Sequence, residues 1–199
     1  LDAHLRDNVR DEVVASLRSA GITCILVSHD QRDALAVSDR IAVMNQGRIE
    51  QIGTPMDIYK QPESIFVATF VGRTNLLQGL IQGENGCVLT DFGSFCQVDR
   101  ASLPDGVPVM VAVRPEGFEL SEDGALKGAI TSTTYTGNNI EAEVEVPTEA
   151  GGQRALTVHL PTNQAYTCGD RVSLALVSDY ASIVRNSCQT LGLNSPDSE

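Results

Sequence analysis

The chain begins with a helical pattern of apolar positions and continues with an extended one. Apolar residues recur every three or four positions between residues 3 and 20, and Gly21 follows them, which predicts an amphipathic helix with a glycine cap. The unbroken apolar run at residues 22–27 (ITCILV) predicts a strand that is buried on both faces in a parallel sheet. Asp30 stands where it can cap a short helix that starts at the next residue.

Residues 40–52 have the pattern of a hairpin. Two short β-rich runs, at residues 40–45 and 48–52, flank the tripeptide NQG. Gly47 supplies the left-handed backbone that a tight turn requires, so we expect two short antiparallel strands here.

Two short helices are predicted after the hairpin. Thr54, Pro55 and Asp57 occur in the order of a helix cap, a first helical residue and a capping-box partner. A second, apolar helix is expected at residues 64–72, ending at Gly72. Residues 1–72 are therefore α/β in character, and they look incomplete because a parallel sheet needs more strands than this segment supplies.

The pattern changes after residue 75 to short β-rich runs separated by glycine-containing turns. Strands at such spacing predict a small antiparallel barrel or sandwich. The last residues, NSPDSE, predict a disordered tail. The predicted strands lie at residues 76–82, 87–92, 95–98, 107–114, 127–135, 140–146, 154–160 and 171–177.

Charge argues against one class of ligand for the second half of the chain. The formal net charge is −12, and the acidic excess is concentrated after residue 75, where sixteen acidic residues accompany six basic ones. Such a surface repels a phosphate backbone. We therefore expect no nucleic-acid partner.

Cysteine usage and hydropathy favour a soluble protein in a reducing compartment. The five cysteines are odd in number, stand mostly in apolar runs and form no C-x-x-C pair, which favours buried free thiols and predicts no metal site. No apolar run approaches the roughly eighteen residues that a membrane span needs, and no signal peptide is visible. The cysteines are Cys24, Cys87, Cys96, Cys168 and Cys188.

His29 stands where the predicted strand at residues 22–27 ends, between Ser28 and Asp30. Ligands of an open parallel sheet gather beyond the carboxyl ends of its strands. A histidine there can donate a hydrogen bond to a phosphate or to an attacking water. The pattern also fits a histidine that is only satisfied at a sheet edge, so both interpretations stay open at this point.

The residues around His29 carry a resemblance to a known family. The opening LDAHLRDNVRDEV and the later stretch ILVSHDQRDALAVSDRIAVMNQGRIEQIGTPMDIYKQPESIFVATFVG resemble the C-terminal third of the nucleotide-binding domain of ATP-binding cassette (ABC) importers. The resemblance implies that His29 is the H-loop histidine, which contacts the γ-phosphate and helps to hold the attacking water. It also implies that Asp2 is the D-loop aspartate, which bridges two nucleotide-binding domains near the nucleotide.

Three motifs of that family are absent from the chain. It contains no G-x-x-x-x-G-K-[ST] loop, no LSGGQ-type signature and no apolar run ending in paired acidic residues ahead of Leu1. We therefore expect it to be the C-terminal portion of a longer ATPase subunit and to be inactive alone. The resemblance implies ATP and Mg²⁺ as cofactors of the full-length subunit and none for this fragment.

The resemblance continues more weakly after residue 72. TNLLQG, VAVRPEGFEL and CGDRVSLAL are similar to the TOBE regulatory region of the maltose-, polyamine- and ferric-iron-type importer ATPases. The fold class implied is an α/β fragment of a P-loop NTPase-type domain followed by an all-β barrel resembling the oligonucleotide-binding (OB) fold. The expected parts are the ABC fragment at residues 1–72, a linker at 73–75, the TOBE domain at 76–190 and a flexible tail at 191–199.

Two short motifs are candidates for a regulatory site. In the first, Arg114, Pro115 and Glu116, the proline can end a strand while the arginine pairs locally with a carboxylate, or the tripeptide can contact a ligand. The second, TGNN, can offer amides and hydroxyls to an oxyanion, as in relatives specialised for molybdate, or can be a plain hairpin turn. Its residues are Thr136, Gly137, Asn138 and Asn139.

The function implied is the C-terminal part of an importer ATPase subunit, peripheral on the cytoplasmic side of the bacterial inner membrane. Membrane-spanning permease subunits and a second copy of the chain are the expected partners, and ferric iron or a polyamine is favoured over a sugar as the solute. A homodimer through residues 1–72 is expected because an incomplete sheet leaves strand edges and apolar faces uncovered. The alternative is a stand-alone OB-fold module that binds a small oxyanion.

Overall fold

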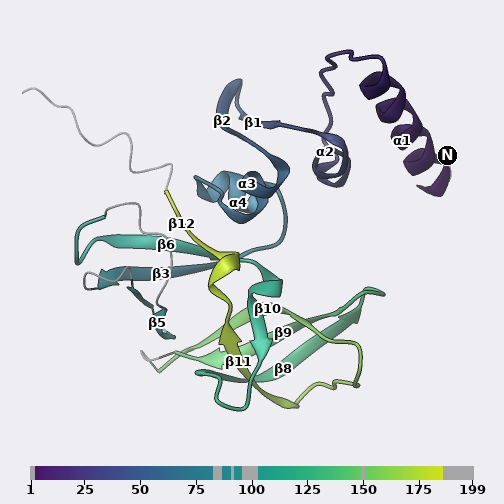
Figure 1. The fold of residues 1–199 in the computed structure, drawn as a ribbon. Coiled ribbons are helices and arrows are strands. Elements are labelled where there is room, and N and C mark those ends of the chain that lie inside the picture. The colour runs from purple at the N-terminus through teal and green to yellow at the C-terminus, as the bar shows by residue number, and fades with distance from the viewer. Residues whose placement is uncertain (1–2, 83–86, 91, 96–102, 149–150, 186–199) are drawn as a thin grey trace, which may run out of the picture.

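The computed structural model describes residues 3–82, 87–90, 92–95, 103–148 and 151–185 (Figure 1). The chain starts with helix α1 (Ala3–Ser19), which ends in a glycine cap, as predicted. Ion pairs from Arg10 to Asp33 (2.7 Å) and from Arg18 to Asp39 (2.8 Å) connect it to the region of the next helix. The N–H of Gly21 donates to the carbonyl of Arg18, and Gly21 has a φ of +65°. The helical pattern and the cap were therefore sufficient to define this element.

The strand predicted at residues 22–27 is wrong. These residues have no regular secondary structure, and the side chains of Ile25 and Val27 are 88% and 92% exposed. A strand that is buried on both faces requires neighbouring strands to bond its backbone and elements to cover its faces, and none lies beside this segment in the described part of the chain.

Residues 31–72 form a small unit of helices around a hairpin. Strands β1 and β2 are joined by Gln46 and Gly47, both at positive φ, which is the turn that the NQG motif predicts. Thr54 and Asp57 form the predicted capping box at the start of α3. The elements are α2 (Gln31–Val37), β1 (Ile41–Asn45), β2 (Arg48–Gly53), α3 (Pro55–Lys60) and α4 (Ile65–Phe70). Their core consists of Val43, Ile58, Val67 and Val71.

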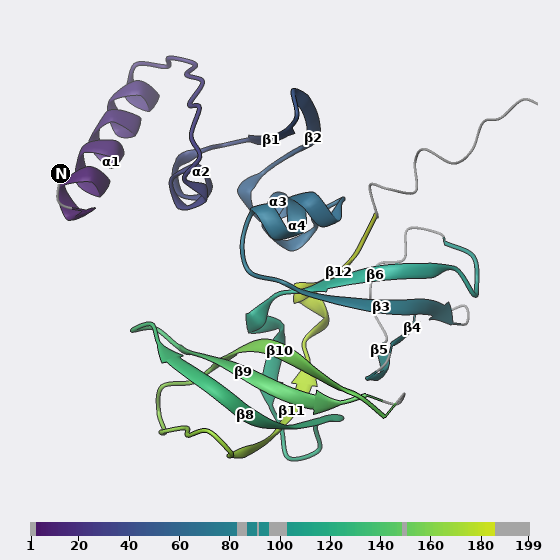
Figure 2. The same cartoon turned by 180° about the vertical axis from the view of Figure 1, so that it is seen from behind.

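The remainder is all-β, as predicted, and consists of two five-stranded antiparallel sheets with the strand orders β12-β6-β3-β4-β5 and β10-β9-β8-β11-β7 (Figure 2). The first sheet contains β3 (Asn75–Gln82), β4 (Cys87–Thr90), β5 (Gly93–Phe95), β6 (Pro108–Val113) and β12 (Ala181–Val184). The second contains β7 (Phe118–Leu120), β8 (Leu126–Tyr135), β9 (Ile140–Pro147), β10 (Gln153–Leu160) and β11 (Arg171–Leu176). Two 3₁₀ turns, η1 (Pro115–Gly117) and η2 (Ser178–Tyr180), lead into β7 and β12.

The two sheets share one apolar core. Fully buried residues of β3 and β6, such as Leu77 and Val111, belong to the same cluster as Val144 of β9 and Leu174 of β11. Two of the strands, β7 and β12, were not predicted. The barrel-or-sandwich prediction is thus confirmed in its strand content and antiparallel pairing.

The helical unit rests on the outer face of the first sheet. Ala68 of α4 packs in a small buried cluster with Ala112 of β6 and Val184 of β12. Beyond β12, the carbonyl of Arg185 accepts from the N–H of Ile65, so the described part of the chain returns to the start of α4. Helices α3 and α4 therefore lie directly against the β domain, whereas α1 does not (Figure 2).

The described cysteines agree with expectation only in part. Cys24 and Cys168 are free, as expected, but they are exposed rather than buried, and Cys87 is disulfide-bonded rather than free. Cys96 and Cys188 lie outside the described residues. Within the described ranges, none of the helices has the length and apolar character that crossing a bilayer demands.

Candidate functional site at the joint between the helices and the β domain

Arg114 is the centre of a polar cluster where the helical unit meets the β domain. It follows β6 directly and is only 2% exposed. Its guanidinium donates to four backbone carbonyls: that of Tyr59 from Nε and Nη2 (3.0 and 2.9 Å), and those of Ala68, Gly72 and Arg73 from Nη1 (2.8, 3.2 and 3.1 Å).

Two of these carbonyls lie in the last turns of α3 and α4, where backbone acceptors have no partner within their own helix. A cation is also favoured there by the helix dipole. Arg114 therefore satisfies the C-terminal ends of two helices at once. The local carboxylate partner that was one alternative for Arg114 is replaced by these carbonyls. Pro115 follows the end of the strand, as predicted, and it also opens η1, which was not predicted.

Tyr59 links Arg114 to Glu116. The guanidinium lies over the Tyr59 ring at 4.3 Å from its centroid, and the Tyr59 hydroxyl donates to Oε1 of Glu116 at 2.7 Å. Burial, together with this hydrogen bond to a carboxylate, raises the pKa of Tyr59 to about 12. Burial also lowers the pKa of Arg114, although a guanidinium keeps its charge in proteins. The tyrosine is thus a neutral donor held between a cation and a carboxylate.

His159 extends the cluster across the second sheet. Its Nδ1 lies 3.7 Å from Oε2 of Glu116, and its Nε2 lies 4.0 Å from Oε2 of Glu141. Glu141 also pairs with Arg73 at 2.6 Å, and the amide nitrogen of Asn139 lies 3.4 Å from Nδ1. Because the two carboxylates sit at opposite ring nitrogens, one ion cannot contact all three side chains. Accordingly, the described residues contain no group of side chains placed to hold a metal ion.

The TGNN motif is a hairpin turn between β8 and β9. The N–H of Thr136 donates to the carbonyl of Asn139 at 3.0 Å, its hydroxyl donates to Oδ1 of Asn139 at 2.7 Å, and Gly137 has a φ of +96°. The turn interpretation is therefore confirmed. Of its four residues, Asn139 is the one that reaches the cluster around Glu116, through His159.

The residues of the expected nucleotide site lie elsewhere. His29 is exposed in a bend just before α2, and its neighbour Asp30 caps that helix by accepting from the N–H of Arg32 at 3.0 Å. Asp2 lies outside the described residues. The structure therefore brings Arg114, Glu116 and Asn139 together and leaves His29 away from them.

Three members of the cluster, Tyr59, Glu141 and His159, were missed in the sequence. They come from α3, β9 and β10, and no local motif marks them. The sequence did contain one indication for His159. It lies between the apolar residues Val158 and Leu160 in a predicted strand, so its side chain is expected on the face of the strand opposite to theirs.

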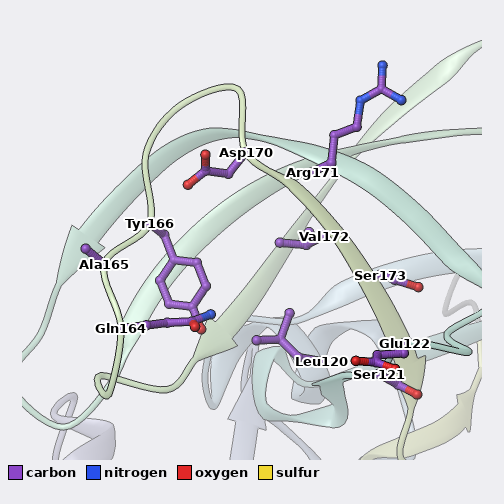
Figure 3. Close-up of a pocket in the computed structure, with 10 residues that line it drawn as sticks. All are labelled: Leu120, Ser121, Glu122, Gln164, Ala165, Tyr166, Asp170, Arg171, Val172 and Ser173. Atoms are coloured by element: carbon purple, nitrogen blue, oxygen red, sulfur yellow. The ribbon is translucent and has the colours of Figure 1, made fainter.

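A concave feature lies on the β domain, and none of the residues that line it belongs to this cluster. It is an open hollow of about 480 Å³ (Figure 3). Tyr166 and Leu120 point into it, while the Arg171 side chain extends away toward solvent. The Tyr166 hydroxyl is buried and has no hydrogen-bond partner among the described residues. The hollow is lined by Leu120, Ser121, Glu122, Gln164, Ala165, Tyr166, Asp170, Arg171, Val172 and Ser173.

Comparison with known protein families gives a match within the second half of the chain. Residues 111–184 match the TOBE domain. This range begins in β6 and ends with β12, so it includes Arg114, Glu116, Glu141 and His159 but not Tyr59.

The chain is also similar to curated import proteins. It is 38% identical over 176 residues to the spermidine/putrescine import ATP-binding protein PotA of Mesoplasma florum, covering 87% of this chain and 49% of that protein. It is 35% identical over 193 residues to PotA 1 of Pseudomonas aeruginosa, covering 92% and 51%. It is 40% identical over 145 residues to the Fe(3+) ions import ATP-binding protein FbpC of Fusobacterium nucleatum, covering 70% and 38%. The chain thus spans about half the length of the curated relatives it matches, or less.

Among solved structures, the cytoplasmic molybdate-binding protein ModG with molybdate bound aligns with 54% of this chain and 92% of its own. The TM-score is 0.40 and the sequence identity is 16%, which is too low to support an argument about fold or function.

Proposed function

We propose that this chain, which is homologous to the ATP-binding subunits of ABC importers and contains a TOBE domain, acts as the C-terminal part of such a subunit, which couples ATP hydrolysis to solute uptake. One observation supports this most directly. The similarity to import ATP-binding proteins extends over 87% to 92% of the chain in the first two relatives, so it includes both the His29 segment and the β domain.

His29 is proposed to contact the γ-phosphate of ATP and to help hold the attacking water, and Asp2 to bridge two nucleotide-binding domains. The His29 side chain is exposed, so it is accessible to a nucleotide held by another part of the subunit. Phosphoryl transfer depends mainly on positioning and charge stabilisation, so a hydrogen bond from one histidine can matter greatly.

ATP and Mg²⁺ are assigned to the rest of the subunit. The sequence has no glycine-rich phosphate loop, and the described residues offer no cluster of ligands for a metal ion. The residues present therefore fit a contributor to the nucleotide site and not the whole of it. ATP supplies the γ-phosphoryl group whose transfer His29 would assist.

The solute, the partners and the location belong to the same proposal. A polyamine or ferric iron is the proposed solute, because the relatives named above import spermidine and putrescine or Fe(3+). Membrane-spanning permease subunits and a second copy of the chain are the proposed partners, at the cytoplasmic face of the membrane. The alternative of a stand-alone oxyanion-binding module is not favoured, because the relatives are import ATP-binding proteins over most of the chain.

ATP turnover by the longer subunit that contains this sequence tests the proposal. The His29→Ala variant should lose most of its turnover, since the donor to the γ-phosphate is removed. Cys24→Ala is the matched control, because it also truncates an exposed side chain in the same irregular segment. Full activity of the His29→Ala variant would show that the histidine has no role at the phosphate.

A further inference from the structure

We propose that Arg114, Tyr59 and Glu116 form a coupling joint, through which the TOBE domain and helices α3 and α4 move as one body. A displacement of the TOBE domain is thereby transmitted to the segment that carries His29. This inference rests on the proposed function and deepens it, because it names the residues by which the β domain acts on the ATPase part of the subunit.

The helical unit and the β domain need polar contacts to fix their relative orientation, because they have separate apolar cores. The core of the helical unit and the core of the two sheets are distinct clusters, and only the small cluster around Ala68, Ala112 and Val184 lies between them. Parts of a chain that share little apolar interface move relative to one another by default. Directional polar contacts are therefore what fixes the orientation here.

Arg114 provides most of these directional contacts. A planar guanidinium with a rigid set of donors is suited to several fixed acceptors, which a lysine ammonium cannot reach together. Its five hydrogen bonds come from the TOBE domain and end on α3, on α4 and on the residues that follow α4. A shift of Arg114 must therefore move both helices.

The end of α3 is held at a second and a third point. The Tyr59 hydroxyl bonds Glu116 in η1, and the Lys60 ammonium lies 4.6 Å from the centroid of the Tyr180 ring in η2. The turns η1 and η2 are themselves close, since a Cβ added at Gly117 would lie 2.9 Å from Cβ of Tyr180. The consecutive residues Tyr59 and Lys60 of α3 thus contact η1 and η2, respectively. These two turns lead into β7 and β12, the edge strands of the two sheets.

The helical unit extends this contact toward His29. Leu35 of α2 packs against the buried cluster that contains Ile58 of α3. The N-terminus of α2 is capped by Asp30, which is adjacent to His29 in the chain. A displacement of α3 is therefore passed to the helix whose first turn follows the histidine.

Hydrogen exchange of this chain tests the joint without any need for ATP. In Arg114→Lys, amides of α2, α3 and α4 should exchange at least about tenfold faster, and in Tyr59→Phe about threefold to tenfold faster, with amides of β8 to β10 unchanged. Tyr135→Phe, which changes a 69% exposed tyrosine of β8, should match the wild type. Unchanged exchange in the helices, or an equal increase in helices and sheets, would contradict the coupling joint.

The longer subunit provides the second readout. Arg114→Lys and Tyr59→Phe should change kcat for ATP at least about threefold while KM stays within about twofold, because the nucleotide is held by other residues. Faster hydrogen exchange in the helices with an unchanged kcat would show that the joint does not affect ATP turnover. The proposed function would then still be decided by the turnover of the His29→Ala variant. If the wild-type longer subunit has no ATPase activity, the proposed function is refuted. Hydrogen exchange of the α2 amides in the two variants would still decide whether the joint transmits motion.

Discussion

The carboxamide of Asn75 pairs with both backbone polar groups of Thr157. Its Nδ2 donates to the Thr157 carbonyl at 2.8 Å, and its Oδ1 accepts from the Thr157 N–H at 2.8 Å. Asn75 opens β3 in one sheet, and Thr157 lies in β10, the edge strand of the other. The side chain therefore takes the place of a neighbouring backbone, which covers an otherwise unpaired edge and connects the two sheets.

Replacing Asn75 by alanine should lower the free energy of unfolding by about 2–4 kcal/mol, because buried donors and acceptors lose their partners. Asn75 is only 8% exposed, so water cannot easily substitute. Urea unfolding followed by circular dichroism measures the change, and Asn138→Ala, in the exposed turn after β8, is the control. A loss below about 0.5 kcal/mol would mean that the edge of β10 needs no such cover.

The raised pKa of Tyr59 predicts a loss of stability at high pH. The unfolded phenol ionises near pH 10, whereas the folded one ionises near 12, so stability is intact below pH 10 and falls as the pH rises between these values. Between pH 9 and pH 11 the wild type should lose about 1 kcal/mol more than Tyr59→Phe, after allowance for partial solvent screening. Urea unfolding at the two pH values measures this difference.

The control for the pH experiment is Tyr135→Phe, at an exposed position of β8, which should keep the pH dependence of the wild type. An equal pH dependence in Tyr59→Phe and wild type would show that burial and the hydrogen bond to Glu116 do not favour the neutral phenol.

Gly124 should not tolerate a side chain. A Cβ there would lie 2.6–2.7 Å from backbone atoms of Leu174 in β11, which cannot move without disturbing the second sheet. Gly124→Ala should therefore cost about 1–3 kcal/mol or more, seen as a lower Tm. Gly152→Ala is the matched control, because its nearest contact would be the Thr148 hydroxyl at 3.3 Å. Equal Tm values for the two variants would contradict the close approach at Gly124.

Elements with local signals could be predicted from the sequence. The capping box of Thr54 and Asp57, the turn at Gly47 and the cap at Gly21 each depend on residues within one or two turns of chain. The β-rich runs after residue 75 were also recognisable, because alternating burial leaves a period of two in the sequence. These local signals contain no information on the order of the strands in the sheets.

The features that were not predicted correctly share one cause: each depends on contacts between residues that are far apart in the chain. The run at residues 22–27 has the composition of a buried strand, but burial requires partners that no local pattern can supply. The joint shows the same limit: Tyr59 and Glu116 are 57 residues apart, so only the fold brings the hydroxyl to the carboxylate. Arg114 was a candidate because of its motif, yet its partners turned out to be helix-end carbonyls, which carry no sequence signature.

Residues 22–27 provide the last prediction, because their apolar side chains have no cover in the described structure. Ile22, Ile25, Leu26 and Val27 are 57%, 88%, 55% and 92% exposed. Extended apolar segments with free backbone groups tend to pair with another chain. We therefore expect this chain to form homodimers or larger assemblies through residues 1–72, with an apparent mass that rises with concentration in light scattering.

Lysines at the two most exposed positions of this segment should weaken the association. The double variant Ile25→Lys and Val27→Lys should shift the chain toward its monomer mass of 21.3 kDa. Met56→Lys is the matched control, because Met56 is 67% exposed on α3 and a lysine there should leave the association unchanged. A wild-type chain that is already a uniform monomer, with residues 22–27 protected from proteolysis, would disprove pairing through this segment and would require its cover to come from within the same chain.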